Sequence, residues 1–319
     1  MKKIIVRSLM ALMLISLMAC MGGRKKQTEQ DRPLITVTIE PLRYFTEAIA
    51  GDRFRVVSMV PTGSSPESYD PTPQQLIDLA DSRAYFRIGY IGFEQTWMEK
   101  LSDNAPHLQV FDTSKGIDLI FEEGGHGHDA HGAHDVHAGE HAAEGAHAHQ
   151  HVGGVEPHVW TSFDNARIIG GNILKALCQL DPEGRESYVR NYNEFFEMVS
   201  QLDTLACGLL SRPEARHAFM IYHPALSYLA RDFGLRQIPI EAGGKEPSPS
   251  QLQDLIVLCK TDSVKTIFIQ PEFDKRNAQL VAEQTGAKLV DINPLSYDWC
   301  QEIMHVVRVL ASSHENFTE

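Results

Sequence analysis

The sequence predicts an α/β fold of two lobes, each a mainly parallel sheet flanked by helices, joined by one long rigid helix. Strand-type and helix-type segments alternate in two separate series, which is typical of parallel sheets. A helical pattern of about seven turns separates the two series. The 319 residues, 43% of them hydrophobic, also exceed what a single core usually holds.

The first series is expected to form a lobe over residues 33–182. Period-two alternation of β-branched residues predicts its strands, and apolar residues at helical spacing predict its helices. The strands are expected at 34–39, 54–60 and 84–88, and the helices at 41–51, 73–81, 94–101 and 165–180. Ligand chemistry in such sheets lies beyond the carboxyl ends of the strands.

The linking helix is expected within residues 183–211, because apolar residues recur at helical intervals from Glu186 to Leu210. Gly184 lies near its start and Pro213 follows its end. The second lobe should occupy residues 212–319. Its strands are expected at 218–222, 236–240, 266–269 and 288–292, and its helices at 225–233, 249–260, 274–285 and 299–311.

The N-terminus has the pattern of an export signal. Three basic residues precede an apolar stretch from Ser8 to Ala19 that is too short to remain as a membrane-spanning helix, so residues 1–19 are predicted to be a signal peptide. The segment ending at Cys20 is similar to the bacterial lipobox, in which the cysteine is acylated; an ordinary signal peptide is the alternative. Residues 20–32 are then a lipidated tether, and the protein is expected in the cell envelope, periplasmic and lipid-anchored to the membrane.

Net charge and cysteine spacing exclude several classes of protein. The formal net charge of −13 becomes −16 without the signal peptide, which repels nucleic acid and favours cations. The four remaining cysteines, Cys178, Cys207, Cys259 and Cys300, form no CxxC pair, so a thiolate metal site is not expected. Cys178, Cys207 and Cys259 are expected to be buried free thiols, while a Cys259 to Cys300 bridge is left open.

Residues 124–151 lack apolar periodicity and are rich in histidine, glycine and acids. Composition predicts a disordered insertion that binds metal weakly. Nine of the fifteen histidines lie here: His126, His128, His131, His134, His137, His141, His147, His149 and His151.

Three loops carry the candidate chemistry, and each follows a predicted strand or opens a helix. Glu67 lies in a proline-rich loop, His158 follows Pro157, and His223 lies between a strand and Pro224. Alone, each side chain would be an ordinary structural or solvated group. Together, two imidazoles and one carboxylate suit Zn²⁺, with one coordination position left for water or a fourth group.

Six ordered blocks carry a resemblance from about Ile35 to the C-terminus: PLRYFTEAIAGDRFRV, MVPTGSSPESYDPTPQQL, EPHVWTSFDNA, YHPALSYLARDFGL, EPSPSQL and GAKLVDINPLS. They resemble the zinc and manganese substrate-binding proteins of ATP-binding-cassette importers, solute-binding protein family nine, including the ZnuA-type zinc proteins. The resemblance implies two α/β lobes joined by one long helix, a metal in the cleft, and a histidine-rich insertion in the first lobe.

The resemblance also implies a ligand set. Glu67 stands where the family has histidine, so a carboxylate replaces an imidazole. His158 and His223 match the second and third ligands, and two histidines there favour zinc over manganese. The fourth place falls near Asn293; because Asn is a poor zinc ligand, water or Asp291 is the alternative.

The resemblance implies a monomeric Zn(II) receptor that delivers its ion to the membrane permease of an ATP-binding-cassette importer. A manganese or iron receptor of the same family and a periplasmic zinc buffer remain alternatives. A zinc hydrolase has the same ligand types, but the sequence has no HExxH motif and nominates no general base, so an enzyme is not expected.

Overall fold

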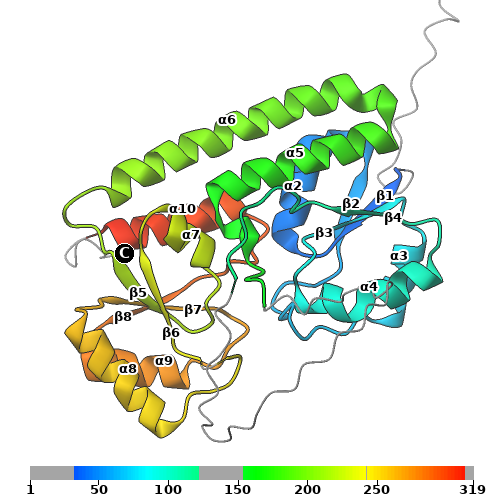
Figure 1. Cartoon of the computed structure of the whole chain (residues 1–319). Helices are drawn as coiled ribbons and strands as arrows, with labels where there is room; N and C mark the ends of the chain where they lie inside the picture. The colour runs from blue at the N-terminus through cyan, green and yellow to red at the C-terminus, as the bar shows by residue number, and fades with distance from the viewer. Residues whose placement is uncertain (1–31, 122–153, 242, 313–319) are drawn as a thin grey trace, which may run out of the picture. The chain divides into compact units, whose positions relative to one another are not determined.

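The computed structural model describes residues 32–121, 154–241 and 243–312, and this part of the chain forms two α/β lobes (Figure 1). The first contains β1 (Leu34–Val37), α2 (Glu40–Ala50), β2 (Arg55–Ser58), α3 (Pro73–Ala80), β3 (Ala84–Arg87), α4 (Gly92–Asn104), β4 (Gln109–Asp112), the 3-10 turn η3 (Val159–Thr161) and α5 (Phe163–Leu180). The long helix α6 (Arg185–Leu210) follows. The second contains β5 (Ala218–Ile221), α7 (Ser227–Asp232), β6 (Arg236–Pro239), α8 (Pro249–Thr261), β7 (Thr266–Ile269), α9 (Arg276–Thr285), β8 (Lys288–Asp291) and α10 (Trp299–Ala311).

Each lobe contains a four-stranded parallel sheet with the same topology. The strand orders are β2-β1-β3-β4 and β6-β5-β7-β8. In each sheet the strand order reverses between the two central parallel strands, β1 and β3 or β5 and β7, and ligands of such sheets bind at the carboxyl ends there. The two-lobe parallel fold predicted from the sequence is confirmed, although β4 was not predicted. This edge strand is short and largely exposed, so its hydrophobic pattern is weak.

Helix starts follow local rules that the sequence shows. Thr72 caps α3 and Ser248 caps α8, each through a capping box with a glutamine three residues later and a proline at the first helical position. Ser162 caps α5 by accepting the amide hydrogen of Asn165. These caps fix where the helices next to the strand-end loops begin.

The long helix α6 has 26 residues and is about 39 Å long. It packs along α5 and also contacts α2 and α10, and Figure 1 shows α5 and α6 side by side. Its buried side chains include Tyr188, Phe195 and Val199. The rigidity of this helix and the lobe boundaries at residues 182 and 211 stay predictions.

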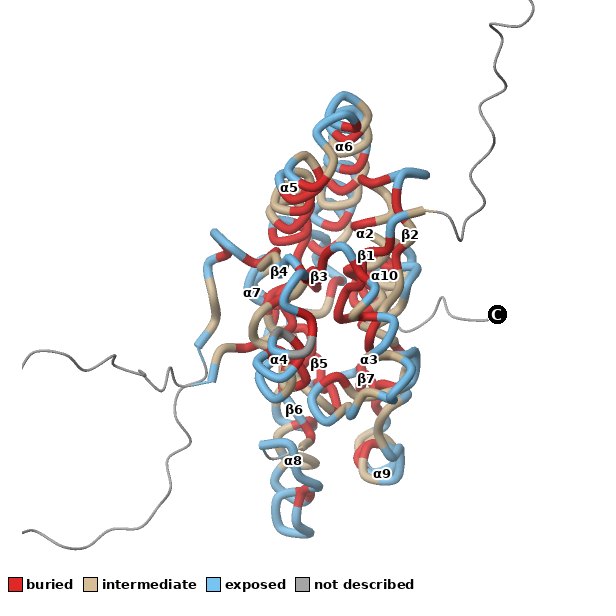
Figure 2. The backbone as a smooth tube through the Cα atoms, turned by 90° about the vertical axis from the view of Figure 1, so that its right-hand side faces the viewer, coloured by how far each residue is buried: buried red, intermediate tan, exposed pale blue. Residues whose placement is uncertain are grey.

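The main hydrophobic core runs through both lobes. It joins side chains of β1, β3, α2 and α5 to Phe219, Ile221 and Phe268 of the second sheet and to α10. A smaller core lies between the second sheet and the helices α8 and α9. Figure 2 shows buried backbone along α5, β1 and β3, whereas α8 and α9 are mostly exposed or half-buried. Shared packing therefore holds the two lobes together in addition to the chain connections.

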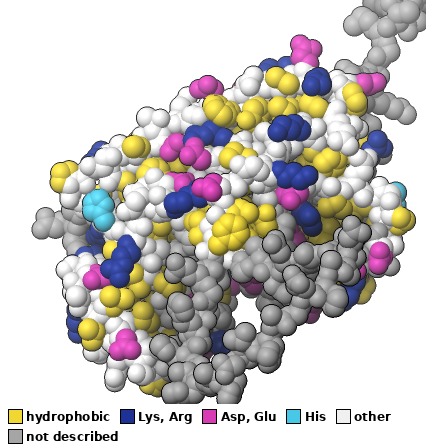
Figure 3. Space-filling view, in the orientation of Figure 1, with side chains coloured by type: hydrophobic (Ala, Val, Ile, Leu, Met, Phe, Trp, Pro, Cys, Tyr) yellow, Lys and Arg dark blue, Asp and Glu magenta, His cyan; other side chains and the backbone are white. Residues whose placement is uncertain are grey.

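The face formed by α5 and α6 mixes charges of both signs (Figure 3). Arg167 illustrates this pattern, because it pairs with both Asp164 and Asp203. No single-sign patch lies on the part of this face that the structure describes. That nucleic acid is not a partner stays a prediction.

All four cysteines of the described chain are free. Cys259 lies in the smaller core and Cys300 packs against the main core, so the bridge that the sequence left open does not form. The prediction of three buried thiols is correct for Cys259 but wrong for Cys207, which is exposed, and Cys178 is half-buried. Cys207 lies on the outer face of α6, where a helical pattern alone does not separate a core residue from a surface one.

The predicted signal peptide, the tether, Cys20 and the nine histidines of residues 124–151 lie outside the described residues. Within the described ranges, none of the helices combines the length and the apolar composition needed to cross a membrane.

Glu94 is a buried acid at the switch point of the first sheet. Its carboxylate accepts hydrogen bonds from the Thr38 hydroxyl and from the backbone amides of Ile88 and Gly89, so it joins the ends of β1 and β3. Burial raises the pKa of Glu94 to about 7, although these hydrogen bonds oppose the shift.

We predict that Glu94 makes folding less favourable as pH rises. Its pKa is higher in the folded protein than its ordinary value of 4.5, so its contribution is full below pH 4.5 and is lost as pH rises to about 7. The Glu94→Gln variant should lack this dependence. Urea unfolding should be measured at pH 4.5 and at pH 8. Between these values the free energy of unfolding of wild type, relative to that of the variant, should fall by about 3 kcal/mol. Glu99→Gln, an exposed control on the same helix, should track wild type; a pH-independent difference for Glu94→Gln would contradict the assignment.

Candidate metal centre

A small pocket contains all three ligands predicted from the loops. Ser65, Pro66 and Glu67 line one side, and His158, His223 and Glu272 are among the residues that line the rest. Its free volume is about 30 Å³, which is enough for a water-sized or ion-sized occupant.

His158 is fixed by the acid two residues before it. The side chain is 5% exposed, and its Nδ1 lies 2.5 Å from Oε1 of Glu156, which also accepts the backbone amide hydrogen of His158. The other oxygen of Glu156 accepts a hydrogen bond from the Ser227 hydroxyl at 3.0 Å. This pairing puts the Nδ1 proton toward Glu156 and leaves Nε2 of the neutral ring as a free donor atom for a metal.

His223 is held in the same way from the second lobe. Its Nδ1 lies 2.9 Å from Oε1 of Glu241, and its ring stacks on Phe273 with a centroid separation of 5.2 Å. The amide of Gln270 binds both backbone groups of His223, accepting its N–H and donating to its C=O. The position and tautomer of this imidazole are therefore set by groups that are not themselves candidate ligands.

The two imidazoles meet at their Nε2 atoms, which are 3.3 Å apart. A tetrahedral ion with metal–nitrogen bonds of about 2.0–2.1 Å places two ligand nitrogens about 3.3–3.4 Å apart. The spacing of His158 and His223 therefore matches one edge of such a site.

Electrostatics around His158 favour a positive charge. Burial by itself lowers the pKa of His158, but the nearby carboxylates, Glu156 first and then Glu67 and Glu241, outweigh it, so the pKa is raised. Burial likewise opposes charge on Glu156, and the His158 imidazole outweighs it and lowers the pKa of that carboxyl. The same field that stabilises an imidazolium also stabilises a metal cation between the rings.

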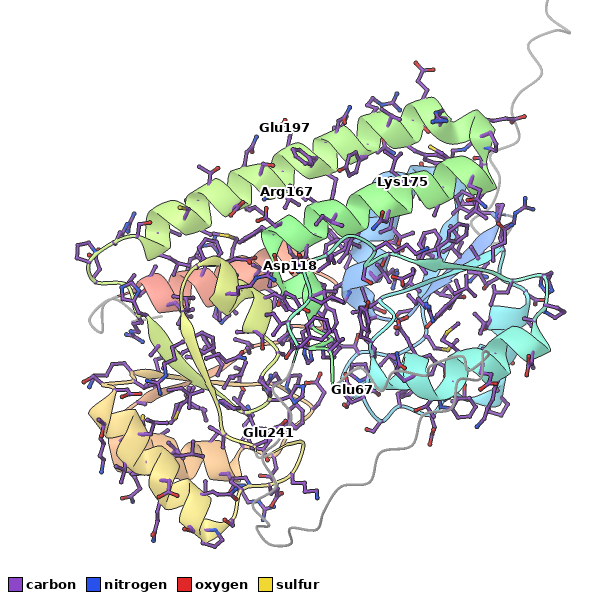
Figure 4. All side chains as sticks on the ribbon, in the orientation of Figure 1. Glu67, Asp118, Arg167, Lys175, Glu197 and Glu241 are labelled. Atoms are coloured by element: carbon purple, nitrogen blue, oxygen red, sulfur yellow. The ribbon has the colours of Figure 1, made fainter. Side chains whose placement is uncertain are left out.

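Glu67 lies at the edge of this pair and is anchored to α4. Its Oε2 accepts the backbone amide hydrogen of Gly92 at 3.0 Å, at the first residue of the helix. Figure 4 shows Glu67 on a loop of the first lobe and Glu241 at the facing edge of the second lobe. Among the described residues, no three His, Cys, Asp or Glu side chains are close enough to hold a metal ion together. Two imidazoles are thus in place, while Glu67 is engaged by Gly92.

The structure does not place the predicted fourth ligands at the pocket. The Asp291 side chain is 74% exposed and pairs with Lys275. The side-chain oxygen of Asn293 accepts the backbone amide hydrogen of Leu295 at 3.1 Å, and neither Asp291 nor Asn293 lines the pocket. Pro294 and Leu295 of this loop line the pocket, whereas its polar lining residues from this side, Gln270 and Glu272, follow the neighbouring strand β7.

Four polar residues of the site were not identified from the sequence: Glu156, Glu241, Gln270 and Glu272. Glu156 belongs to the EPHVW block, and the other three follow strands β6 and β7 by one to three residues. Their position directly after strands makes Glu241, Gln270 and Glu272 candidates, but the sheet order that brings them to the pocket is not visible in the sequence.

The fold and the pocket define a two-lobed binding protein for an ion-sized ligand. The chain belongs to the ZnuA family of metal-binding substrate-binding proteins of ATP-binding-cassette importers, because the family model described as "Zinc-uptake complex component A periplasmic" matches residues 35–312. The resemblance inferred from the sequence blocks is thereby confirmed. Members of this family are transport proteins, which also confirms the prediction that this protein is not an enzyme.

Individual relatives are named for two metals. The "High-affinity zinc uptake system protein ZnuA" of Bacillus subtilis (strain 168) is 28% identical over 83% of this chain and 79% of its own length. The "Manganese ABC transporter substrate-binding lipoprotein PsaA" of Streptococcus anginosus is 26% identical over 90% of this chain and 87% of its own length. A crystal structure of ZnuA is 32% identical, with a TM-score of 0.76, over 88% of this chain and 98% of that chain. The family thus binds divalent metals, and these names do not select one.

We predict that Gly92 is required for the position of the Glu67 loop. A Cβ at Gly92 would lie 2.5 Å from the Glu67 carbonyl oxygen and 2.8 Å from its Oε2, so Gly92→Ala must displace the loop. This substitution should destabilise the protein by about 1–3 kcal/mol in urea unfolding. Gly208→Ala on α6, where no atom lies within 4 Å of the added Cβ, should instead stabilise by about 0.5–1 kcal/mol. Equal effects of the two substitutions would contradict the close approach.

Proposed function

We propose that this protein captures Zn²⁺ outside the cytoplasm and delivers it to the membrane permease of an ATP-binding-cassette importer. The observation that carries this proposal is the pair of Nε2 atoms 3.3 Å apart, each on a ring whose Nδ1 is paired with a carboxylate. Glu67, His158 and His223 are the proposed ligands, with Glu67 leaving Gly92 to reach the ion. Two imidazoles and a carboxylate form a common zinc ligand set.

Delivery requires that the protein stay near the permease. We propose that Cys20 carries a lipid anchor and that residues 20–32 are a tether, which keeps the folded part at the membrane surface. The relatives named as lipoproteins support this arrangement. A tethered receptor meets its permease more often, because the tether raises the effective concentration.

We predict that His158→Ala and His223→Ala each weaken zinc binding at least tenfold, or by about 1.4 kcal/mol. Each substitution removes one of the two nitrogen donors already in place. Affinity should be measured by competition with a zinc chelator strong enough to strip the weak sites expected on residues 124–151. His217→Ala is a matched control, because this exposed residue lies at the opposite end of β5 from His223. Unchanged affinity in His223→Ala would exclude the pocket as the tight site.

Manganese is the second candidate cargo. The carboxylate of Glu67 in a position where the family has histidine, together with the manganese-named relatives, favours it. We predict that zinc, and not manganese, remains with protein purified without chelator or affinity tag. Elemental analysis combined with anomalous scattering at the zinc edge checks this result. Stoichiometric manganese in the pocket would make this chain a manganese receptor.

A further inference from the structure

Glu272 is a carboxylate of the pocket wall that the ligand set described above does not use. It is half-buried, and its Oε1 is fully buried without a hydrogen-bond partner among the described residues. A buried carboxylate oxygen without a partner is unfavourable, so its retention needs an explanation. A cation in the pocket would supply the missing partner.

The topology of the second sheet explains why Glu272 lies there. The strands β5 and β7 are parallel neighbours at the switch point, so their carboxyl ends lie side by side. His223 comes two residues after the end of β5, and Glu272 comes three residues after the end of β7. Burial raises the pKa of the Glu272 carboxyl, while its own backbone amide and the His223 imidazole favour its charged form without outweighing burial. The two side chains are therefore electrostatic neighbours at one edge of the sheet.

Other oxygen donors on this side of the pocket have different roles. The Gln270 amide is occupied by the backbone N–H and C=O of His223. Asp291 is exposed and paired with Lys275, so it points away from the pocket. Among the carboxylates of the second lobe, Glu241 already holds Nδ1 of His223. Among the described carboxylates of this lobe, Glu272 lines the pocket and has an oxygen, Oε1, that no hydrogen bond engages.

We propose that Glu272 is the fourth ligand of the transported metal, an inference that rests on the proposed function. The complete site then has two imidazole nitrogens from His158 and His223 and two carboxylates, Glu67 from the first lobe and Glu272 from the second. Both carboxylates reach the ion by rotation of their side chains, which accounts for the absence of a three-residue cluster among the described residues. Two carboxylates balance the charge of a divalent cation, so the site selects divalent over monovalent ions.

The test compares Glu272→Gln with Asp291→Asn in the full-length protein, using Zn²⁺ and a competing chelator. Glu272→Gln should bind zinc at least tenfold more weakly, and Asp291→Asn should bind like wild type. Thermal unfolding of the metal-free proteins identifies any loss of folding, which is not expected for a substitution of equal size. A larger loss of zinc affinity in Asp291→Asn than in Glu272→Gln would overturn the proposal.

Co²⁺ provides a second readout that a purely structural role of Glu272 would not change. The visible spectrum of bound Co²⁺ reports ligand number and geometry. Glu272→Gln should alter this spectrum, while the exposed control Glu283→Gln on α9 should not. An unchanged spectrum and affinity in Glu272→Gln, with loss of binding in His158→Ala, would refute Glu272 as a ligand and leave the proposed function standing. Retained binding in both histidine variants would instead refute the proposed function.

Discussion

Two imidazole nitrogens that face each other at 3.3 Å are the constraint on which the site depends. Both rings carry their Nδ1 protons toward carboxylates, so two lone pairs would repel unless a cation or a proton lies between them. The rings stay in this arrangement because each is held on its far side, His158 by Glu156 and His223 by Glu241. The pocket is therefore preorganised for positive charge before any ligand arrives.

The distance between the imidazoles depends in turn on packing between the lobes. The Ser227 hydroxyl of the second lobe binds Glu156, and the Tyr228 hydroxyl binds the Glu156 backbone carbonyl. Two indole groups continue this connection: Trp160 donates to the Pro294 carbonyl, and Trp299 donates to the Trp160 carbonyl, each at 2.8 Å. Because the main core is shared as well, separating the lobes would expose apolar surface and break buried hydrogen bonds. The relative position of His158 and His223 is thus set by the interface and not by α6 alone.

Sequence reasoning succeeded where a local pattern determines the structure. The helix α10 begins at Trp299 and ends at Ala311 as the apolar periodicity predicts, and the capped starts of α3 and α8 follow from Thr72 and Ser248. It did not predict β4, a short and largely exposed edge strand that is defined by its pairing with β3.

Side-chain direction at strand ends was the other part that the sequence could not determine. Asn293 and Asp291 are close in sequence to residues that line the pocket. The Asn293 side chain, however, binds the backbone of its own loop, and the Asp291 side chain faces solvent. Glu272 comes from the neighbouring strand, and only the sheet order brings it beside His223. Tertiary pairing thus decides which carboxylates reach the pocket.

The carboxylate of Glu67 determines how the first lobe would take part in the metal binding proposed above. A carboxylate can accept the Gly92 amide hydrogen at the N-terminus of α4, where the helix dipole favours negative charge, whereas an imidazolium would be repelled there. Glu94 holds the preceding turn by accepting hydrogen bonds from the amides of Ile88 and Gly89, so the start of α4 presents a fixed N–H donor, that of Gly92, to Glu67. The negative end of Glu67 is therefore satisfied by the helix start, and with Glu67 as a ligand, as proposed, a cation between the imidazoles would compete with Gly92 for this carboxylate. The affinity of the site is then a difference between two interactions of one side chain, which makes the start of α4 part of the binding equilibrium although it provides no ligand.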